Sequence, residues 1–170
     1  ADEAYFDPPS RGRRSGLDAR LLRQCLTVLP NRSPLIFGPE DFVAGAMRAM
    51  QEKHRGCVLV SSDGTERGQL AGIFTERDVL NKIIGQGRNP ALVKLGDVMV
   101  SEPEALPSDA SVAWVLNKMS VGGFRHVPVV NVRGCPVAVI SVRDVVEFLV
   151  EAFPNEILNL PPDFGVRKDI

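Results

Sequence analysis

The chain has 170 residues, of which 44% are hydrophobic, a size and composition typical of about one globular domain. Its 20 basic and 21 acidic residues give a net charge of −1, so there is no strong positive field to gather nucleic acid or anionic lipid. We therefore expect neither nucleic acid nor a membrane as a partner.

The cysteines and the apolar runs indicate a compartment. Cys25, Cys57 and Cys135 lack metal-type spacing, and their odd number disfavours the disulfide framework of a secreted protein. No apolar run approaches the roughly 18 residues of a membrane span, and the N-terminus lacks the apolar core of a signal peptide. These features predict a cytoplasmic chain without a metal site.

Residues 1–31 are expected to form an N-terminal arm and a short helix. The first 16 residues mix prolines, glycines and three arginines without a hydrophobic period, which predicts a flexible arm. From Leu17 to Leu26, leucines and Cys25 recur on one helical face, and Pro30 follows. This pattern predicts a short docking helix.

Residues 32–90 contain a first set of alternating strand and helix patterns. The set comprises a strand near Ser33–Phe37, a helix with Glu40 and Asp41 in its first turn, strands at Cys57–Val60 and Gln69–Phe74, and a helix from Thr75 to about Ile84. The order is strand, helix, strand, strand, helix.

Residues 91–153 repeat that order after a linker over Lys94–Val100. The set comprises a strand at Glu104–Leu106, a helix capped by Ser108, strands at Val127–Val130 and Val137–Ile140, and a helix from Ser141 toward Phe153. A tail over 154–170 is expected to pack across the body or a partner. Because repeats of roughly 60 residues bury too little surface alone, we expect an α+β fold of two β-α-β-β-α units packed as a pseudo-two-fold pair.

One phrase ends both repeats. Gly72-Ile73-Phe74-Thr75-Glu76-Arg77-Asp78 matches Ala138-Val139-Ile140-Ser141-Val142-Arg143-Asp144, and both are followed by Val. Each copy places a hydroxyl, a guanidinium and a carboxylate where a strand gives way to a helix. The simplest interpretation is a helix capping box that needs no ligand.

The chemistry of the phrase also fits a ligand. Ligands commonly bind in a crevice at the end of a sheet, where helix N-termini lie. An Asp carboxylate can accept hydrogen bonds from both hydroxyls of a ribose, and an Arg attracts phosphate. Asp78 or Asp144 would then hold the sugar, with Arg77 or Arg143 toward the charge. A nucleotide combines these two groups.

Further basic residues precede the central strands: His54-Arg55-Gly56 in the first repeat and Phe124-Arg125-His126 in the second. Such residues at a strand start are more often simply solvated. They point to a site only through their duplication.

These motifs together resemble a tandem pair of cystathionine β-synthase (CBS) domains, the arrangement called a Bateman module, here as a stand-alone CBS domain protein. The resemblance covers about residues 32–150. It is carried by the duplicated phrase, by the strand Val127–Val130 after Arg125-His126, and by Asp97-Val98-Met99 before the second repeat.

The resemblance implies a regulatory sensor that binds AMP, ADP, ATP or a similar adenosine ligand between the repeats, forms a homodimer and signals to a separate effector protein. It implies that Asp78 and Asp144 bind ribose. Thr75, Ser141, Arg77 and Arg143 would lie near the phosphates.

The two implied sites differ. Arg125 and His126 would join the phosphate side of the Asp144 site, and the backbone around His54, Gly56 and Val58 would frame the base there. Val100, Phe124 and His126 would frame the base of the Asp78 site. Gly56 stands where the second repeat has His126, so the first repeat's phosphate contacts would depend on Arg55 and Arg77; we therefore favour the Asp144 site for phosphate-rich ligands.

Two other classes of function were weighed. An enzyme is disfavoured because the chain has only two histidines, His54 and His126, and no nucleophile elbow, P-loop or metal spacing. The alternative to a sensor is a dimerisation or interaction module that binds no nucleotide.

Overall fold

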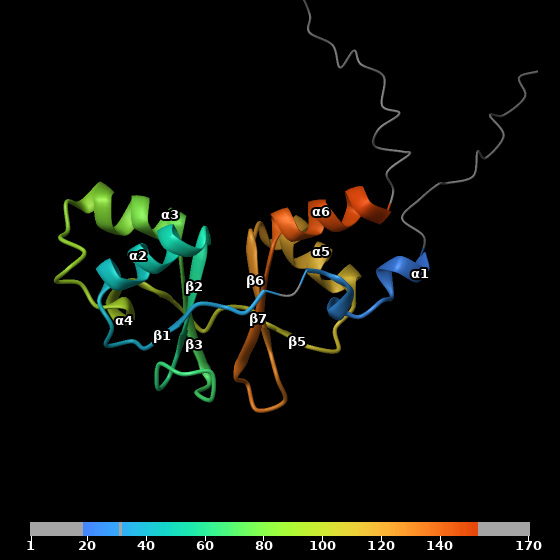
Figure 1. Ribbon diagram of the computed structural model, residues 1–170, viewed down its shortest axis with the longest axis horizontal. Coiled ribbons are helices and arrows are strands. Elements are labelled where there is room, and N and C mark those ends of the chain that lie inside the picture. Colours follow the sequence, from blue (N-terminus) through green and yellow to red (C-terminus); the bar gives the residue numbers. More distant parts are fainter. Residues whose placement is uncertain (1–18, 31, 153–170) are drawn as a thin grey trace, which may run out of the picture.

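The structure, a computed structural model, describes residues 19–30 and 32–152. The expected arm over 1–16 and tail over 154–170 lie outside these ranges. Within them the strands form two sheets, in the orders β1-β2-β3-β4 and β5-β6-β7. Figure 1 shows the two halves side by side, with their sheets toward each other and their main helices outside.

Each half has the expected order of strand, helix, strand, strand, helix. The first half contains β1 (Ile36–Phe37), α2 (Val43–Lys53), β2 (Cys57–Ser61), β3 (Leu70–Thr75) and α3 (Glu76–Asp78), which continues through η2 (Val79–Ile83) and η3 (Ile84–Gln86). The second half contains β5 (Leu106–Pro107), α5 (Val112–Gly122), β6 (His126–Val130), β7 (Pro136–Ser141) and α6 (Val142–Ala152). The α+β fold of two paired repeats is confirmed.

Strand pairing is the same in both halves. The short first strand runs parallel to the central strand, β1 on β2 and β5 on β6, and the central strand pairs antiparallel with the strand that carries the motif. Because side chains alternate between the faces of a sheet, Val58 and Val60 face the helices of their own half. Cys57 and Leu59 face the other half, where they pack with Val139.

The predicted linker over Lys94–Val100 is wrong, since this segment is structured. It contains α4 (Leu95–Val98) and leads into β4 (Val100–Ser101), which pairs antiparallel with β3. Gly72 permits the close approach, because a Cβ there would lie 2.3 Å from Met99 Sδ. A strand of two residues is too short to produce a detectable sequence pattern.

The predicted helix over Leu17–Leu26 is also wrong in its extent. Within the described residues it comprises α1 (Ala19–Leu22), and η1 (Leu26–Val28) follows after a break. The break occurs because the chain bonds to the second half: Cys25 forms a β-bridge with Ser111, and Leu26 N donates to Ala110 O. Leu26 is buried in the second half's core, so the segment docks as expected.

Two predicted helix starts are displaced. Asp41 is not in the first turn of α2, because its carboxylate accepts a hydrogen bond from Gly38 N at 2.7 Å. Ser108 is not the N-cap of α5; that position is Ser111. In both helices a remote carbonyl accepts the first amide, Val93 O for Val43 N and Gln24 O for Val112 N. Sequence near the helix start cannot reveal such partners.

No helix in the described part of the chain combines the length and apolar character needed to cross a membrane.

Candidate nucleotide site

The first copy of the repeated phrase forms a capping box at the start of α3. Thr75 N and Thr75 Oγ1 donate to Asp78 Oδ2 at 3.0 and 3.2 Å, and Asp78 N lies 3.4 Å from Thr75 Oγ1. The other carboxylate oxygen, Oδ1, lies 3.2 Å from Lys82 Nζ, one helical turn further on. Lys82 Nζ also donates to Val98 O at 2.7 Å, so two partners hold this ammonium group in place.

The second copy forms the same local cap. Ser141 N donates to Asp144 Oδ2 at 2.8 Å, and Asp144 N donates to Ser141 Oγ at 3.2 Å. Its Oδ1 has a more distant partner, Arg32 Nε at 3.8 Å. The capping interpretation therefore holds for one oxygen of each acid, while the other oxygen lies outside the cap and faces a cation, Lys82 for Asp78 and Arg32 for Asp144.

The register of the central strands corrects the alignment of the two repeats. Cys57 pairs with Thr75, and His126 pairs with Ser141, so His126 corresponds to Cys57. It follows that Arg125 corresponds to Gly56, and the sequence-based alignment, which matched Gly56 with His126, is wrong by one residue. The alternation of side chains between the two faces of a strand explains the error. Arg55 and Arg125 both precede an apolar central strand, but only the strand register shows which face of the sheet each following side chain occupies.

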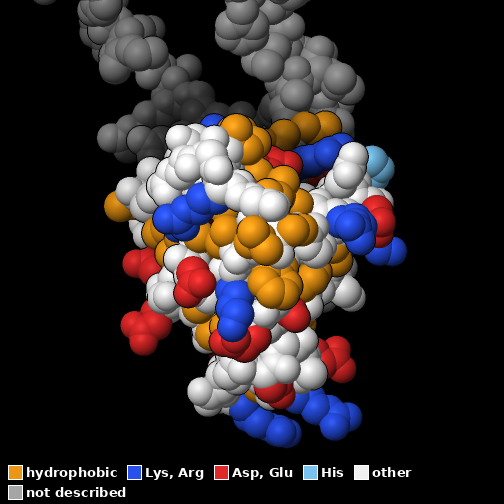
Figure 2. All heavy atoms as spheres, turned by 90° about the vertical axis from the view of Figure 1, so that its left-hand side faces the viewer, with side chains coloured by type: hydrophobic (Ala, Val, Ile, Leu, Met, Phe, Trp, Pro, Cys, Tyr) orange, Lys and Arg blue, Asp and Glu red, His pale blue; other side chains and the backbone are white. Residues whose placement is uncertain are grey.

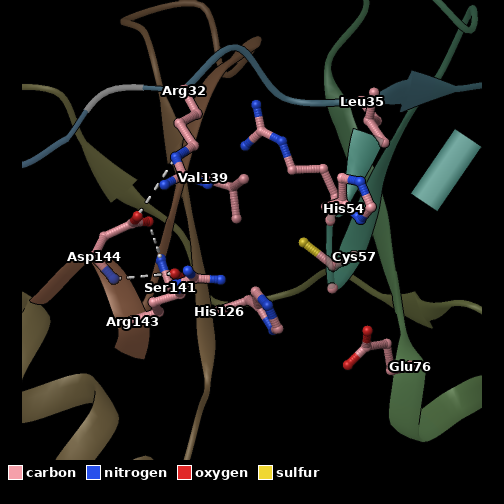
Figure 3. A pocket seen from close by; sticks show the side chains of 12 residues that line it. Arg32, Leu35, His54, Cys57, Glu76, His126, Val139, Ser141, Arg143 and Asp144 are labelled. Atoms are coloured by element: carbon pink, nitrogen blue, oxygen red, sulfur yellow. Dashed lines mark hydrogen bonds and ion pairs between the residues drawn. The ribbon is translucent and has the colours of Figure 1, made fainter. Parts of the chain in front are cut away.

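A cavity of about 250 Å³ surrounds Asp144 at the boundary of the halves. Its lining residues are Arg32, Leu35, His54, Arg55, Gly56, Cys57, Glu76, His126, Val139, Ser141, Arg143 and Asp144. Figure 3 shows Ser141, Arg143 and Asp144 on one side and His54, Cys57 and Glu76 on the other, with His126 between them.

A second cavity, of about 540 Å³, surrounds Asp78. Its lining residues are Ile73, Thr75, Glu76, Arg77, Asp78, Leu80, Val100, Glu102, Pro103, Glu104, Gly123, Phe124, Arg125, His126 and Pro128. Each cavity thus combines the motif of one half with the start of the central strand of the other. Only Glu76 and His126 line both.

This composite construction reverses one sequence-based expectation. Arg125 was expected beside Asp144 but lines the Asp78 cavity, and Arg55 was expected to serve the first repeat but lines the Asp144 cavity. The reason is that the helix start of each repeat faces the strand start of its neighbour.

The remaining candidates divide between the cavities as follows. His54, Gly56, Ser141 and Arg143 lie with Asp144; Thr75, Arg77, Val100 and Phe124 lie with Asp78; His126 lies in both. Val58 lines neither cavity, because its fully buried side chain packs in the first half's core. Its neighbour Cys57 occupies the cavity side instead.

Sequence reasoning missed several lining residues. Strand alternation could have identified Cys57, since Val58 faces the helices. The position of Glu76 inside the duplicated phrase was also a signal. Arg32 had none, because it precedes the first strand of its repeat and reaches Asp144 only through the fold.

Burial sets the protonation of two cavity residues. It lowers the pKa of His126 below the ordinary 6.5, although the charges of Glu76 and Asp144 act in the opposite direction. Burial also raises the pKa of Cys57 to about 12, so this thiol stays protonated at neutral pH.

Residues 19–30 and 32–152 contain no group of three or more His, Cys, Asp or Glu side chains that could hold a metal ion.

Comparisons with protein families and with known proteins point to the same family. The model described as "CBS domain" matches residues 26–85 and 95–151. The mitochondrial CBS domain-containing protein CBSX3 of Arabidopsis thaliana is 34% identical over 123 residues, which cover 71% of this chain and 59% of the relative. CBSCBSPB3 of the same organism is 23% identical over 82% of this chain and 25% of its own length. The chain therefore spans less than two thirds of the length of these two relatives, 59% and 25%.

Solved structures with the same fold include one in complex with a nucleotide and one with bound metal. The CBS domain protein PAE2072 from Pyrobaculum aerophilum, complexed with AMP, has a TM-score of 0.64 and 22% identity, covering 74% of this chain and 94% of that one. Hypoxic Response Protein I, with two coordinated zinc ions, has a TM-score of 0.60 and 21% identity, with coverages of 71% and 94%. At these identities the likeness concerns the fold.

Proposed function

This chain belongs to the CBS domain family, and on that premise we propose that it is a regulatory module that binds an adenosine nucleotide such as AMP, ADP or ATP between its repeats and catalyses no reaction. The observation that carries the proposal is the Asp144 carboxylate. One of its oxygens is committed to the helix cap, and the other lies at a cavity lined by three arginines.

The chemistry of that cavity matches the parts of a nucleotide. Asp144 Oδ1 can accept hydrogen bonds from the two ribose hydroxyls, as charge-assisted bonds. Arg32, Arg55 and Arg143 supply cations for the phosphate, and Leu35 and Val139 offer apolar surface for a base. The AMP complex of PAE2072 supports this class of ligand.

The Asp78 cavity is the second proposed site. Thr75, Arg77 and Asp78 would contact the sugar and phosphate, while Val100 and Phe124 would contact the base. Lys82 already holds the free oxygen of Asp78, so a ribose must compete with a fixed lysine there. We propose weaker nucleotide binding in this cavity.

Signalling would pass to a separate effector protein. A ligand that contacts both halves shifts their relative arrangement only if it binds one arrangement more tightly. A ligand in either cavity would contact both halves, because each cavity takes side chains from both of them. A reducing compartment, the cytoplasm in our proposal, suits three free cysteines.

A homodimer is the proposed assembly. Exposed hydrophobic side chains gather on the outer face of the first half (Figure 2). The exposed apolar side chains of the first half include Leu80, Ile84 and Leu92. Light scattering should show the dimer, and replacing Leu80 and Ile84 by Glu should dissociate it if this face mediates pairing.

The alternative is an interaction module without a ligand. Thermal unfolding separates the two, since a ligand that binds only the folded chain raises Tm with the logarithm of its concentration. We expect AMP, ADP or ATP to raise Tm and GMP to act less. The absence of any shift with all adenine nucleotides would leave the interaction module.

A further inference from the structure

Among the described residues that line the Asp144 cavity, Arg32 is the one arginine outside both the duplicated phrase and the basic segments that lead into the central strands. Leu26 and Leu29 before it are buried in the second half's core, whereas β1 after it belongs to the first half's sheet. The connecting segment therefore passes from one half to the other beside the cavity. In Figure 3 the Arg32 side chain extends from this segment toward Asp144.

The guanidinium of Arg32 is loosely held. Its Nε lies 3.8 Å from Asp144 Oδ1 and its Nη2 lies 3.9 Å from Glu147 Oε2, both beyond hydrogen-bonding distance. The side chain is 40% exposed, so solvent screens these ion pairs. Glu147 has a second cation, Arg143 Nε at 3.4 Å, and does not depend on Arg32.

Arg32 also stands in front of the atom that a ribose would use. Asp144 Oδ2 is committed to Ser141 N, so Oδ1 is the oxygen left for sugar hydroxyls. A ribose bound there must displace the guanidinium. The displaced cation then remains at the cavity, together with Arg55 and Arg143. A 5′-phosphate would give it a stronger partner than it has now, whereas a nucleoside would give it none.

We propose that Arg32 is the residue by which the Asp144 cavity distinguishes nucleotides from nucleosides, by exchanging Asp144 for the ligand's phosphate. The inference rests on the proposed function and goes beyond it, because it assigns phosphate specificity to a residue outside the duplicated phrase. It also connects ligand occupancy to the segment that joins the docked N-terminal residues to β1.

The Asp78 cavity lacks this device. Phe37 pairs with Val60 and Leu106 pairs with Val129, which are equivalent positions of the two central strands, so Phe37 corresponds to Leu106. Arg32 lies five residues before Phe37, and the residue five before Leu106 is Ser101, which therefore matches Arg32. The free oxygen of Asp78 is held instead by Lys82, from its own helix. Asp78→Asn therefore provides a background in which binding reports on the Asp144 cavity.

Calorimetric titration with AMP and with adenosine tests the exchange. In the Asp78→Asn background, Arg32→Ala should weaken AMP binding about tenfold, as expected for one lost charge-assisted contact, while adenosine binding stays equal or improves. Arg32→Lys should weaken AMP binding less. Arg48→Ala, an exposed arginine on α2, is the matched control and should change neither affinity.

Three outcomes are distinguishable. A fall of about tenfold in the ratio of AMP affinity to adenosine affinity supports the exchange. An unchanged ratio overturns it, whether both affinities fall together or neither changes, and leaves the proposed function intact. If the original chain binds neither AMP nor adenosine, the exchange is wrong; if it also binds neither ADP nor ATP, the proposed function is wrong as well. The Tm of each variant, measured without ligand, verifies that it is folded.

Discussion

The two cavities share a local cap but differ in everything that the opposite half contributes. Where the Asp144 cavity receives Arg55, the corresponding position in the Asp78 cavity is Phe124. Where it receives Leu35, the other receives Glu104, which is paired with Lys118. The duplicated phrase thus fixes the geometry of the capping carboxylate in each cavity, and the non-duplicated neighbours set the charge. The lining of the Asp144 cavity includes three arginines and two acids, whereas that of the larger Asp78 cavity includes two arginines and four acids.

The largest expected effect comes from removing the carboxylate of Asp144 from its cavity. Asp144→Ala should weaken nucleotide binding about 100-fold, because two hydrogen bonds to a charged group are lost. The broken cap should cost about 1 kcal/mol of folding free energy as well. Calorimetry and denaturant unfolding measure the two effects. Asp78→Ala, the matched change, should lose its cap but little nucleotide affinity; equal losses from both variants would contradict the asymmetry.

Exchanging the corresponding residues sharpens the comparison. Phe124→Arg should add a third arginine to the Asp78 cavity, beside Arg77 and Arg125, and strengthen AMP binding there about tenfold. Arg55→Phe should weaken AMP binding at the Asp144 cavity by a similar factor. Binding is best followed with the other cavity disabled, in Asp144→Ala and Asp78→Ala backgrounds. If neither change alters AMP affinity, the opposite half does not set phosphate preference.

A smaller effect tests the wall between the cavities. A Cβ at Gly56 would lie 2.8 Å from His126 Nε2, so Gly56→Ala must displace the imidazole. We expect about 1 kcal/mol of destabilisation, as for mild overpacking. In His126→Ala the same Gly56→Ala change should cost much less, since its obstacle is gone. A double-mutant cycle by urea unfolding gives this coupling, and strict additivity would show that the two residues do not interact.

The smallest effect is a pH dependence from His126. Its pKa lies below 6.5 in the folded chain because of burial, despite Glu76 and Asp144 nearby, while Arg125 also lowers it. Between the folded pKa and 6.5 the unfolded chain binds more protons. The free energy of unfolding should therefore fall as pH drops from 7 through 6.5. Urea unfolding of His126→Gln should show a weaker fall; a fall as steep as in the original chain would locate the titration elsewhere.

The sequence predicted the parts of the molecule that local pattern determines. Both central strands, both motif-bearing strands and the helix after Ser141 follow from apolar period and turn residues, and the duplicated phrase located both carboxylates. What failed was decided by distant partners. The start of α5 depends on Gln24 O, and the place of Arg125 depends on which half it faces. Arg32 reaches Asp144 only after the N-terminal segment has docked, so no local signal marked it.

A crystal structure of the chain with AMP tests the central claim most directly. The account predicts both ribose hydroxyls within hydrogen-bonding distance of Asp144 Oδ1, with Oδ2 still accepting from Ser141 N and the Arg32 guanidinium moved onto the phosphate. AMP bound away from Asp144, or bound there with Arg32 still against the carboxylate, would contradict it.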